Sequence, residues 1–151
     1  MYVDYEFYKI IYGEAVDEVT FNRLLWSAEK KVKNATTGID GRCKLDFAFP
    51  DTESDVEAVK RCICDLVNLM DKIAKAEEQS QTNKVVKSVS AGNESITYDV
   101  NGGLIGAVLK DTTAQNKLYS DTIKEYLQGT RDKNGVNLLF GGIYPYIYTE
   151  V

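Results

Sequence analysis

The stretch Ser54–Glu78, with the sequence SDVEAVKRCICDLVNLMDKIAKAEE, is the strongest structural signal in the chain. Its first four residues form a capping box, in which the Ser54 hydroxyl and the Glu57 carboxylate each accept the other residue's N–H. Apolar side chains then recur at steps of three and four residues, which places them on one helical face. They are Val56, Val59, Ile63, Leu66, Val67, Met70, Ile73 and Ala74. The pattern predicts a central helix that begins at Ser54 and has apolar neighbours on more than one side.

Further helical patterns flank this central helix. Thr20 precedes an apolar stripe that runs from Phe21 to Ala35 and ends in turn-forming residues. A second capping box at Thr112 begins a shorter helix that we expect to end at Gly129. A short aromatic helix over residues 2–13 completes the set. The sequence thus predicts a mainly α fold: one domain over residues 1–151, built as a small bundle of two long helices and a shorter C-terminal helix.

A β-hairpin is expected to protrude from this bundle. Residues 79–83 form a polar break, and β-branched residues then flank a Gly-Asn pair at Gly92. An isolated hairpin is marginally stable in water and would leave valines exposed, so we expect a partner subunit to cover it. The expected contact residues on the hairpin are Val86, Val89, Gly92, Ile96 and Tyr98.

Two aromatic features outside the expected core are open to interpretation. Trp26 lies opposite the apolar stripe of its helix, so it is either a chance surface residue or an anchor of a subunit interface. Tyr144, Tyr146 and Tyr148 alternate around Pro145, which favours an extended C-terminal arm over residues 141–151. The alternative is that this end folds back onto its own domain.

The composition excludes several classes of function. The net charge of -5 and the pI near 4.8 argue against a surface that grips nucleic acid phosphates. The sequence has no histidine, so the commonest general base and the usual zinc ligand sets are missing. Three cysteines make no disulfide framework, and we expect reduced thiols in a cytosolic compartment. No export signal or membrane-spanning stretch is expected. We therefore expect no enzymatic activity, no cofactor and no metal site.

Three blocks of the sequence resemble the gp6-like family of head-tail connector (adaptor) proteins of tailed bacteriophages and prophages. The first block contains Tyr8, Tyr12 and Gly13 and continues into the helix over residues 21–28. The second is the core helix over residues 59–71, and the third is the serine-rich stretch over residues 85–98. Leu138 to Ile143 is similar to a late motif of the family, but Gly141 stands where a basic residue is usual.

The resemblance implies a subunit that assembles into a ring under the portal, extends the DNA channel and provides the docking surface for the tail. Its partners would be other copies of itself, the portal protein and the next head-completion or tail protein. DNA would pass through the ring without sequence-specific binding, and no membrane would be involved. The protein would be found in the virion neck and, during assembly, in the cytoplasm of the bacterial host.

By analogy with the family, the hairpin would contact the next subunit, with Trp26 a further candidate for that interface. The arm with Tyr144, Tyr146 and Tyr148 would reach the portal or a tail component. An alternative function is a monomeric or dimeric regulatory or nucleic-acid-associated helical module.

Overall fold

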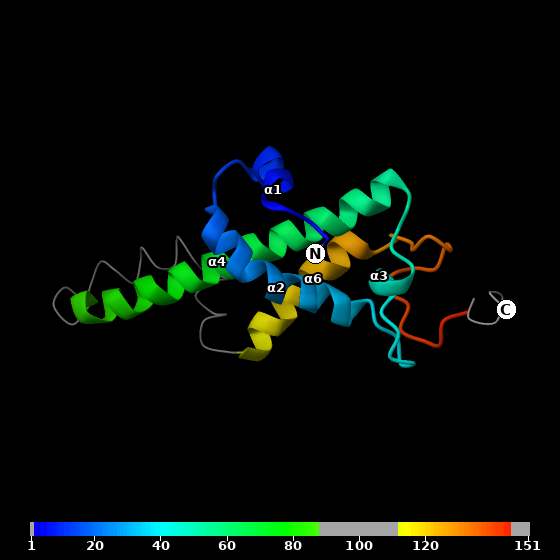
Figure 1. Ribbon diagram of the computed structural model, residues 1–151. Helices are drawn as coiled ribbons and strands as arrows, with labels where there is room; N and C mark the ends of the chain where they lie inside the picture. The colour runs from blue at the N-terminus through cyan, green and yellow to red at the C-terminus, as the bar shows by residue number, and fades with distance from the viewer. Residues whose placement is uncertain (1, 88–111, 146–151) are drawn as a thin grey trace.

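The computed structural model describes residues 2–87 and 112–145, with side chains described for residues 2–78 and 112–145. Helices dominate these ranges, as the sequence predicts (Figure 1). They are α1 (Tyr5–Tyr12), α2 (Glu18–Ala35), α3 (Lys44–Phe47), α4 (Glu53–Lys87) and α6 (Thr112–Leu127). None of the described helices is both long and apolar enough to span a membrane.

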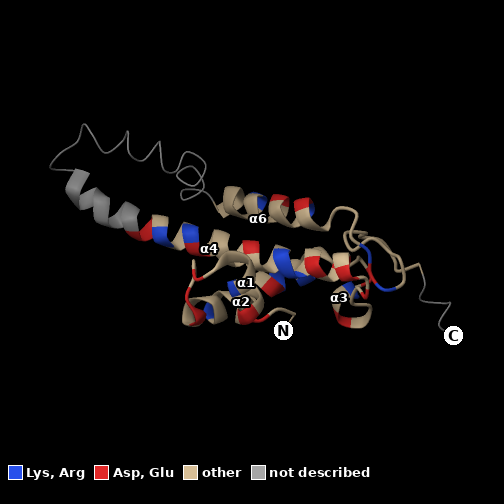
Figure 2. Ribbon diagram, turned by 90° about the horizontal axis from the view of Figure 1, so that it is seen from above, with Lys and Arg blue, Asp and Glu red and all other residues tan. Residues whose placement is uncertain are grey.

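The long helix α4 is the centre of the bundle. It packs against both α2 and α6, which also contact each other (Figures 1 and 2). The buried side chains of its predicted apolar face are Val59, Ile63, Leu66, Val67, Met70 and Ile73. Each such side chain stabilises the fold by roughly 1.5 to 3 kcal/mol before the entropy of ordering is subtracted. The predicted central role of this segment is confirmed.

The ends of the two longest helices differ from the sequence-based prediction. α4 begins at Glu53, and the Val56 N–H donates to the Thr52 carbonyl at 2.9 Å, so Thr52 rather than Ser54 accepts the first helical hydrogen bond. α2 begins at Glu18 because the Asp17 carboxylate caps it, accepting from the Thr20 N–H at 2.8 Å. Alternative capping residues close together in the sequence compete, and the earlier one is used in both helices.

The far end of α4 corrects part of the hairpin prediction. The helix continues to Lys87, so the polar residues 79–83 do not end it and Val86 lies in a helix rather than in a strand. Neither glycine nor proline occurs between Glu78 and Lys87, so nothing there breaks a helix. The rest of the predicted hairpin, with Val89, Gly92, Ile96 and Tyr98, lies outside the described residues.

The short helix α1 is held on α4 by tyrosine side chains. The buried Tyr8 donates its hydroxyl to the Asn68 side chain, and Tyr12 donates to one oxygen of Asp65. The other oxygen of Asp65 accepts from Tyr126 of α6. Two causes raise the pKa of Tyr126 to about 12: burial, which is the larger, and the hydrogen bond to the Asp65 carboxylate. These phenols therefore stay protonated, and one carboxylate links α1 to α6 across α4.

The two cysteines of α4 belong to the core. Cys62 and Cys64 are fully buried and unpaired. Burial in apolar surroundings raises the pKa of both thiols to about 12, so they are unreactive. Their role is core packing.

Two loops at one end of the bundle have matching backbones. We call residues 36–44, after α2, the first loop and residues 130–138, after α6, the second loop (Figure 1). Each contains an antiparallel bridge, between Thr37 and Cys43 in the first and between Arg131 and Asn137 in the second. The second loop turns at an Asn-Gly pair, with Gly135 at a φ of +87°.

Candidate interaction surface

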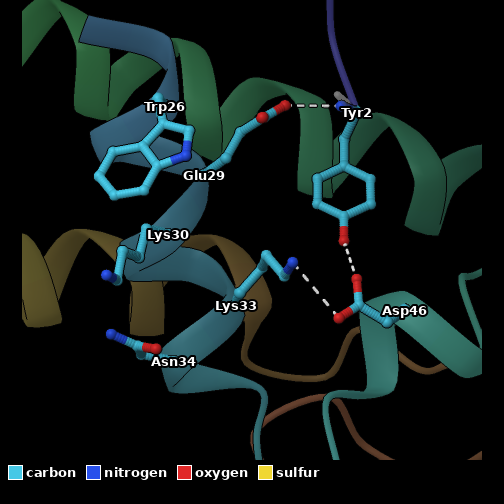
Figure 3. A pocket seen from close by; sticks show the side chains of 7 residues that line it. All are labelled: Tyr2, Trp26, Glu29, Lys30, Lys33, Asn34 and Asp46. Carbon is cyan, nitrogen blue, oxygen red and sulfur yellow. Dashed lines mark hydrogen bonds and ion pairs between the residues drawn. The ribbon is translucent and has the colours of Figure 1, made fainter.

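The open side of α2 contains a pocket with a volume of about 640 Å³ near the start of the chain (Figure 3). Two rows of α2 side chains form its floor, because residues four apart lie one above the other on a helix. The first row is Trp26, Lys30 and Asn34, and the second is Glu29 and Lys33. Tyr2 from the N-terminal segment and Asp46 from α3 close the pocket on the side of the second row.

The second row is fully paired. The Glu29 carboxylate accepts from the Tyr2 backbone N–H at 2.6 Å, and Lys33 lies 3.3 Å from Asp46. The Tyr2 hydroxyl donates to the other oxygen of Asp46 at 2.6 Å. The hydrogen bond from Tyr2 and the pairing with Lys33 lower the pKa of the Asp46 carboxyl. This side of the pocket is thus a fixed wall.

The side chains of the first row form no ion pair or hydrogen bond with other described residues, and we call this the unpaired row. The indole of Trp26 is 68% exposed, and Lys30 lies over it with its Nζ 4.8 Å from the ring centroid. Such a contact is worth about 0.5 to 1 kcal/mol at an exposed site. Lys30 forms no ion pair within the part of the chain that the structure describes. An aromatic surface, a cation and the Asn34 amide therefore face solvent together, a combination suited to an aromatic and acidic partner.

Apart from Ile10 on α1, the large apolar side chains that are exposed in the described residues lie in two separate regions. On α2, Val19 is 78% exposed and lies seven residues before Trp26, hence on the same face of the helix. We call this region the α2 face. The other region is the loop end, where Ile39 is 82% exposed, Ile143 is 64% exposed and Phe140 is 42% exposed. The Ile39 N–H donates to the Gly141 carbonyl at 2.8 Å, which brings the two chain segments of the loop end together.

Tyr144 is part of the folded loop end. Its ring is 2% exposed and meets the edge of Phe47 at a centroid distance of 4.7 Å. Its hydroxyl donates to Asp132 at 2.5 Å, and its backbone N–H donates to Asp40 at 3.1 Å. The extended arm expected from residue 141 therefore does not begin before Tyr144, which the fold holds away from solvent. Tyr146 and Tyr148 lie outside the described residues.

Sequence reasoning found Trp26 but missed the residues that complete its pocket. Tyr2, Glu29 and Asp46 meet only after α1, α2 and α3 have packed, and no spacing in the sequence brings them together. The Trp26–Lys30–Asn34 spacing is a local signal that could have identified the unpaired row.

No family model, curated protein or solved structure matches the chain. Among the described side chains, no group of three or more histidine, cysteine or acidic residues is placed to hold a metal ion.

Proposed function

We propose that the protein is a structural subunit that assembles with copies of itself into a ring, as a phage head-tail connector under the portal. The sequence resemblance to the connector family is the origin of this proposal. The observation that carries it is the exposed Trp26 beside the unpaired Lys30, on a face of the bundle distinct from the loop end. In this function the ring extends the DNA channel and provides the surface to which the tail attaches.

Ring closure requires two different and complementary surfaces on each subunit. The α2 face and the loop end offer such a pair, because each exposes large apolar side chains that a lone subunit leaves in water. Aromatic residues at the centre of an interface commonly supply much of its binding energy. In the proposed ring, Trp26 on the α2 face of one subunit is therefore the main anchor. Ile39 and Ile143 contribute from the loop end of the neighbouring subunit.

The charge of the chain suits a channel. Binding to DNA phosphates depends on lysine and arginine displacing counterions, and the net charge here is -5. A subunit of this charge lets DNA pass without holding it. Val89, Gly92, Ile96 and Tyr98 remain proposed contacts with the next subunit, and Tyr146 and Tyr148 remain proposed contacts with the portal or tail. Deleting residues 88–99, which follow α4, tests the first group by its effect on assembly.

The main test compares single substitutions in an assembly assay. Trp26→Ala and Ile143→Ser should each reduce ring formation at least about tenfold, as expected for loss of 1.4 kcal/mol or more per interface. Rings are counted by electron microscopy of the purified protein with and without a portal protein, and subunit association is followed by sedimentation velocity. Ile10→Ser is the matched control, because Ile10 is 81% exposed on α1 but belongs to neither surface.

Two outcomes would contradict the proposal. One is a ring population that Trp26→Ala and Ile143→Ser leave unchanged. The other is a protein that stays monomeric with portal present and binds DNA with a steep salt dependence in a filter assay. The second outcome would instead support the nucleic-acid-associated module.

A further inference from the structure

The second loop contains a chemically labile pair, Asn134 followed by Gly135. Such a pair deamidates when the backbone nitrogen of the glycine attacks the side-chain carbonyl carbon of the asparagine and closes a succinimide ring. Glycine favours this step because it has no side chain to hinder ring closure. Ammonia leaves as the ring forms, and water then opens the ring to aspartate or isoaspartate. The neutral amide is thereby replaced by a carboxylate.

Hydrogen bonds hold both reacting groups of this pair. The Gly135 N–H, which must lose its proton when the nitrogen attacks, donates to the Asp132 carbonyl at 3.0 Å. The Asn134 side-chain amide donates to the Tyr144 hydroxyl at 2.9 Å. Ring closure therefore requires the Asn134 amide to leave Tyr144 and the Gly135 N–H to leave Asp132.

Tyr144 is a fixed partner for this amide. Its ring is 2% exposed, and its hydroxyl donates to the Asp132 carboxylate at 2.5 Å, which leaves the oxygen to accept from Asn134. The backbone N–H of Tyr144 donates to Asp40 in the first loop at 3.1 Å. Asp40 and Asn134 are matching residues, because each directly precedes the positive-φ glycine of its loop. Tyr144 thus holds the turn residues of both loops.

A carboxylate at position 134 would not fit this arrangement. It has no proton to donate to the Tyr144 hydroxyl, so it would compete with Asp132 for the single proton of that hydroxyl, and the two like charges would repel. Isoaspartate would in addition lengthen the backbone of the turn. The first loop tolerates Asp40 at the matching position because Tyr144 presents an N–H donor there.

We propose that Asn134 is a deamidation site whose rate is set by the contact with Tyr144, and that its modification releases Tyr144 from the second loop. Ile143 directly precedes Tyr144, and Ile39 directly precedes Asp40. Release therefore alters the exposed apolar surface of the loop end. This inference stands independently of the proposed ring.

The first test is Tyr144→Phe, which keeps a ring against Phe47 but removes the hydroxyl that holds the amide. It should accelerate deamidation at Asn134 by roughly threefold to tenfold, the factor expected for loss of one hydrogen bond. The full chain is incubated in neutral buffer, and mass spectrometry of its proteolytic peptides gives the fraction of aspartate and isoaspartate at position 134 over time. Tyr126→Phe is the matched control, because it also removes a hydroxyl that donates to a carboxylate.

A second measurement needs no substitution. In the unaltered chain unfolded by urea, Asn134 should deamidate at least about tenfold faster than in the folded chain, because the hydrogen bonds of both reacting groups are already broken. Circular dichroism shows whether each sample is folded. This comparison decides the question even if Tyr144→Phe does not fold.

The consequence of modification is tested with a variant that carries the product. Asn134→Asp should lower the thermal midpoint by roughly 3 °C or more. Asn137→Asp is the matched control in the same loop. The side-chain oxygen of Asn137 accepts from the Leu139 N–H at 2.8 Å, and a carboxylate accepts equally well, so its midpoint should hardly change.

Three results would overturn the proposal. The first is an Asn134 rate that Tyr144→Phe leaves unchanged or that Tyr126→Phe raises equally. The second is the same rate in the folded and the unfolded chain. The third is an equal fall in thermal midpoint for Asn134→Asp and Asn137→Asp, which would show that the new carboxylate does not disturb the hold of Tyr144.

Discussion

The first loop and the second loop have the same backbone but are closed by opposite charges. Each begins with a threonine, Thr36 or Thr130, whose hydroxyl donates to a carbonyl in the last turn of the preceding helix. Each turns at a glycine with positive φ, Gly41 at +78° and Gly135 at +87°. The corresponding backbone hydrogen bonds also match, with Lys44 N donating to Thr36 O and Leu138 N to Thr130 O. Helix end and turn chemistry alone thus produce this backbone twice.

Different side chains hold the two loops closed. In the second loop the buried Asp132 carboxylate accepts from the N–H groups of Asn134 and Val136, both at 2.9 Å, so that loop is closed from within. The first loop has Gly38 at the corresponding position. Within the first loop the exposed Asp40 accepts only from the Arg42 N–H, at 3.0 Å, and the buried charge that holds the loop is Lys44, which is 1% exposed and whose counterpart is Leu138. Since Lys44 also donates to the Phe140 carbonyl, the first loop depends on the segment that follows the second loop, whereas the second loop is closed by its own Asp132.

The largest effect is expected when the internal closure of the second loop is removed. Asp132→Ala should lower the free energy of unfolding by about 3 kcal/mol, because two backbone N–H groups and the Tyr144 hydroxyl lose a buried, charged acceptor. Chemical denaturation measures this loss. Asp40→Ala in the first loop is the control and should cost clearly less, since Asp40 is exposed. Equal losses would mean that the second loop is not self-supporting.

A smaller effect is expected where the first loop approaches the segment after the second loop. A Cβ added at Gly38 would lie 2.5 Å from the Gly142 carbonyl oxygen, which is backbone and cannot turn aside. Gly38→Ala should therefore destabilise the protein by about 2 kcal/mol. Gly141→Ala is the matched control, because a Cβ there would meet nothing within 4 Å. Thermal melting of both variants would refute the close approach if their midpoints fell by the same amount.

The smallest effect concerns the charge of Lys44. Lys44→Met should cost about 1 kcal/mol at neutral pH, because hydrogen bonds to the Thr36 and Phe140 carbonyls are lost while the burial of a charge is relieved.

The pH dependence of that difference is diagnostic. Burial lowers the pKa of Lys44, so in the alkaline range between its folded and unfolded values the unfolded chain binds more protons. The contribution of Lys44 to stability therefore rises with pH there, and Lys44→Met abolishes the rise. Tyrosines with raised pKa, such as Tyr126, act in the opposite direction above about pH 10, but they do so in both proteins. A stability difference that does not change up to pH 10 would show that Lys44 is not buried as a cation.

The sequence predicted those parts of the fold that local chemistry determines. The core face of α4, the extent of α6 from Thr112 to the turn at Gly129, and the turn at Gly135 all have signals within a few residues. The common spacing from Thr36 to Gly41 and from Thr130 to Gly135 is a local signal of two similar loops that sequence reasoning missed. Helix starts were less certain, because several capping residues stand side by side.

Contacts between distant residues could not be predicted. Lys44 has the appearance of a surface lysine, and only its packing against the loop around Phe140 buries it. The alternation of tyrosines around Pro145 favoured an arm, yet Tyr144 is held by Asp40 and Asp132, neither of which its local sequence reveals. In the pocket, Trp26 was identifiable as an exposed aromatic, but its wall of Tyr2 and Asp46 was not.

The shared carboxylate of Asp65 has a consequence for the order in which the protein is completed. A helix of eight residues such as α1 is too short to be stable alone in water. Its Tyr12 joins Asp65 beside Tyr126, which the ribosome adds more than a hundred residues later. Helix α1 therefore reaches its final arrangement only after Tyr126 of α6 has been synthesised.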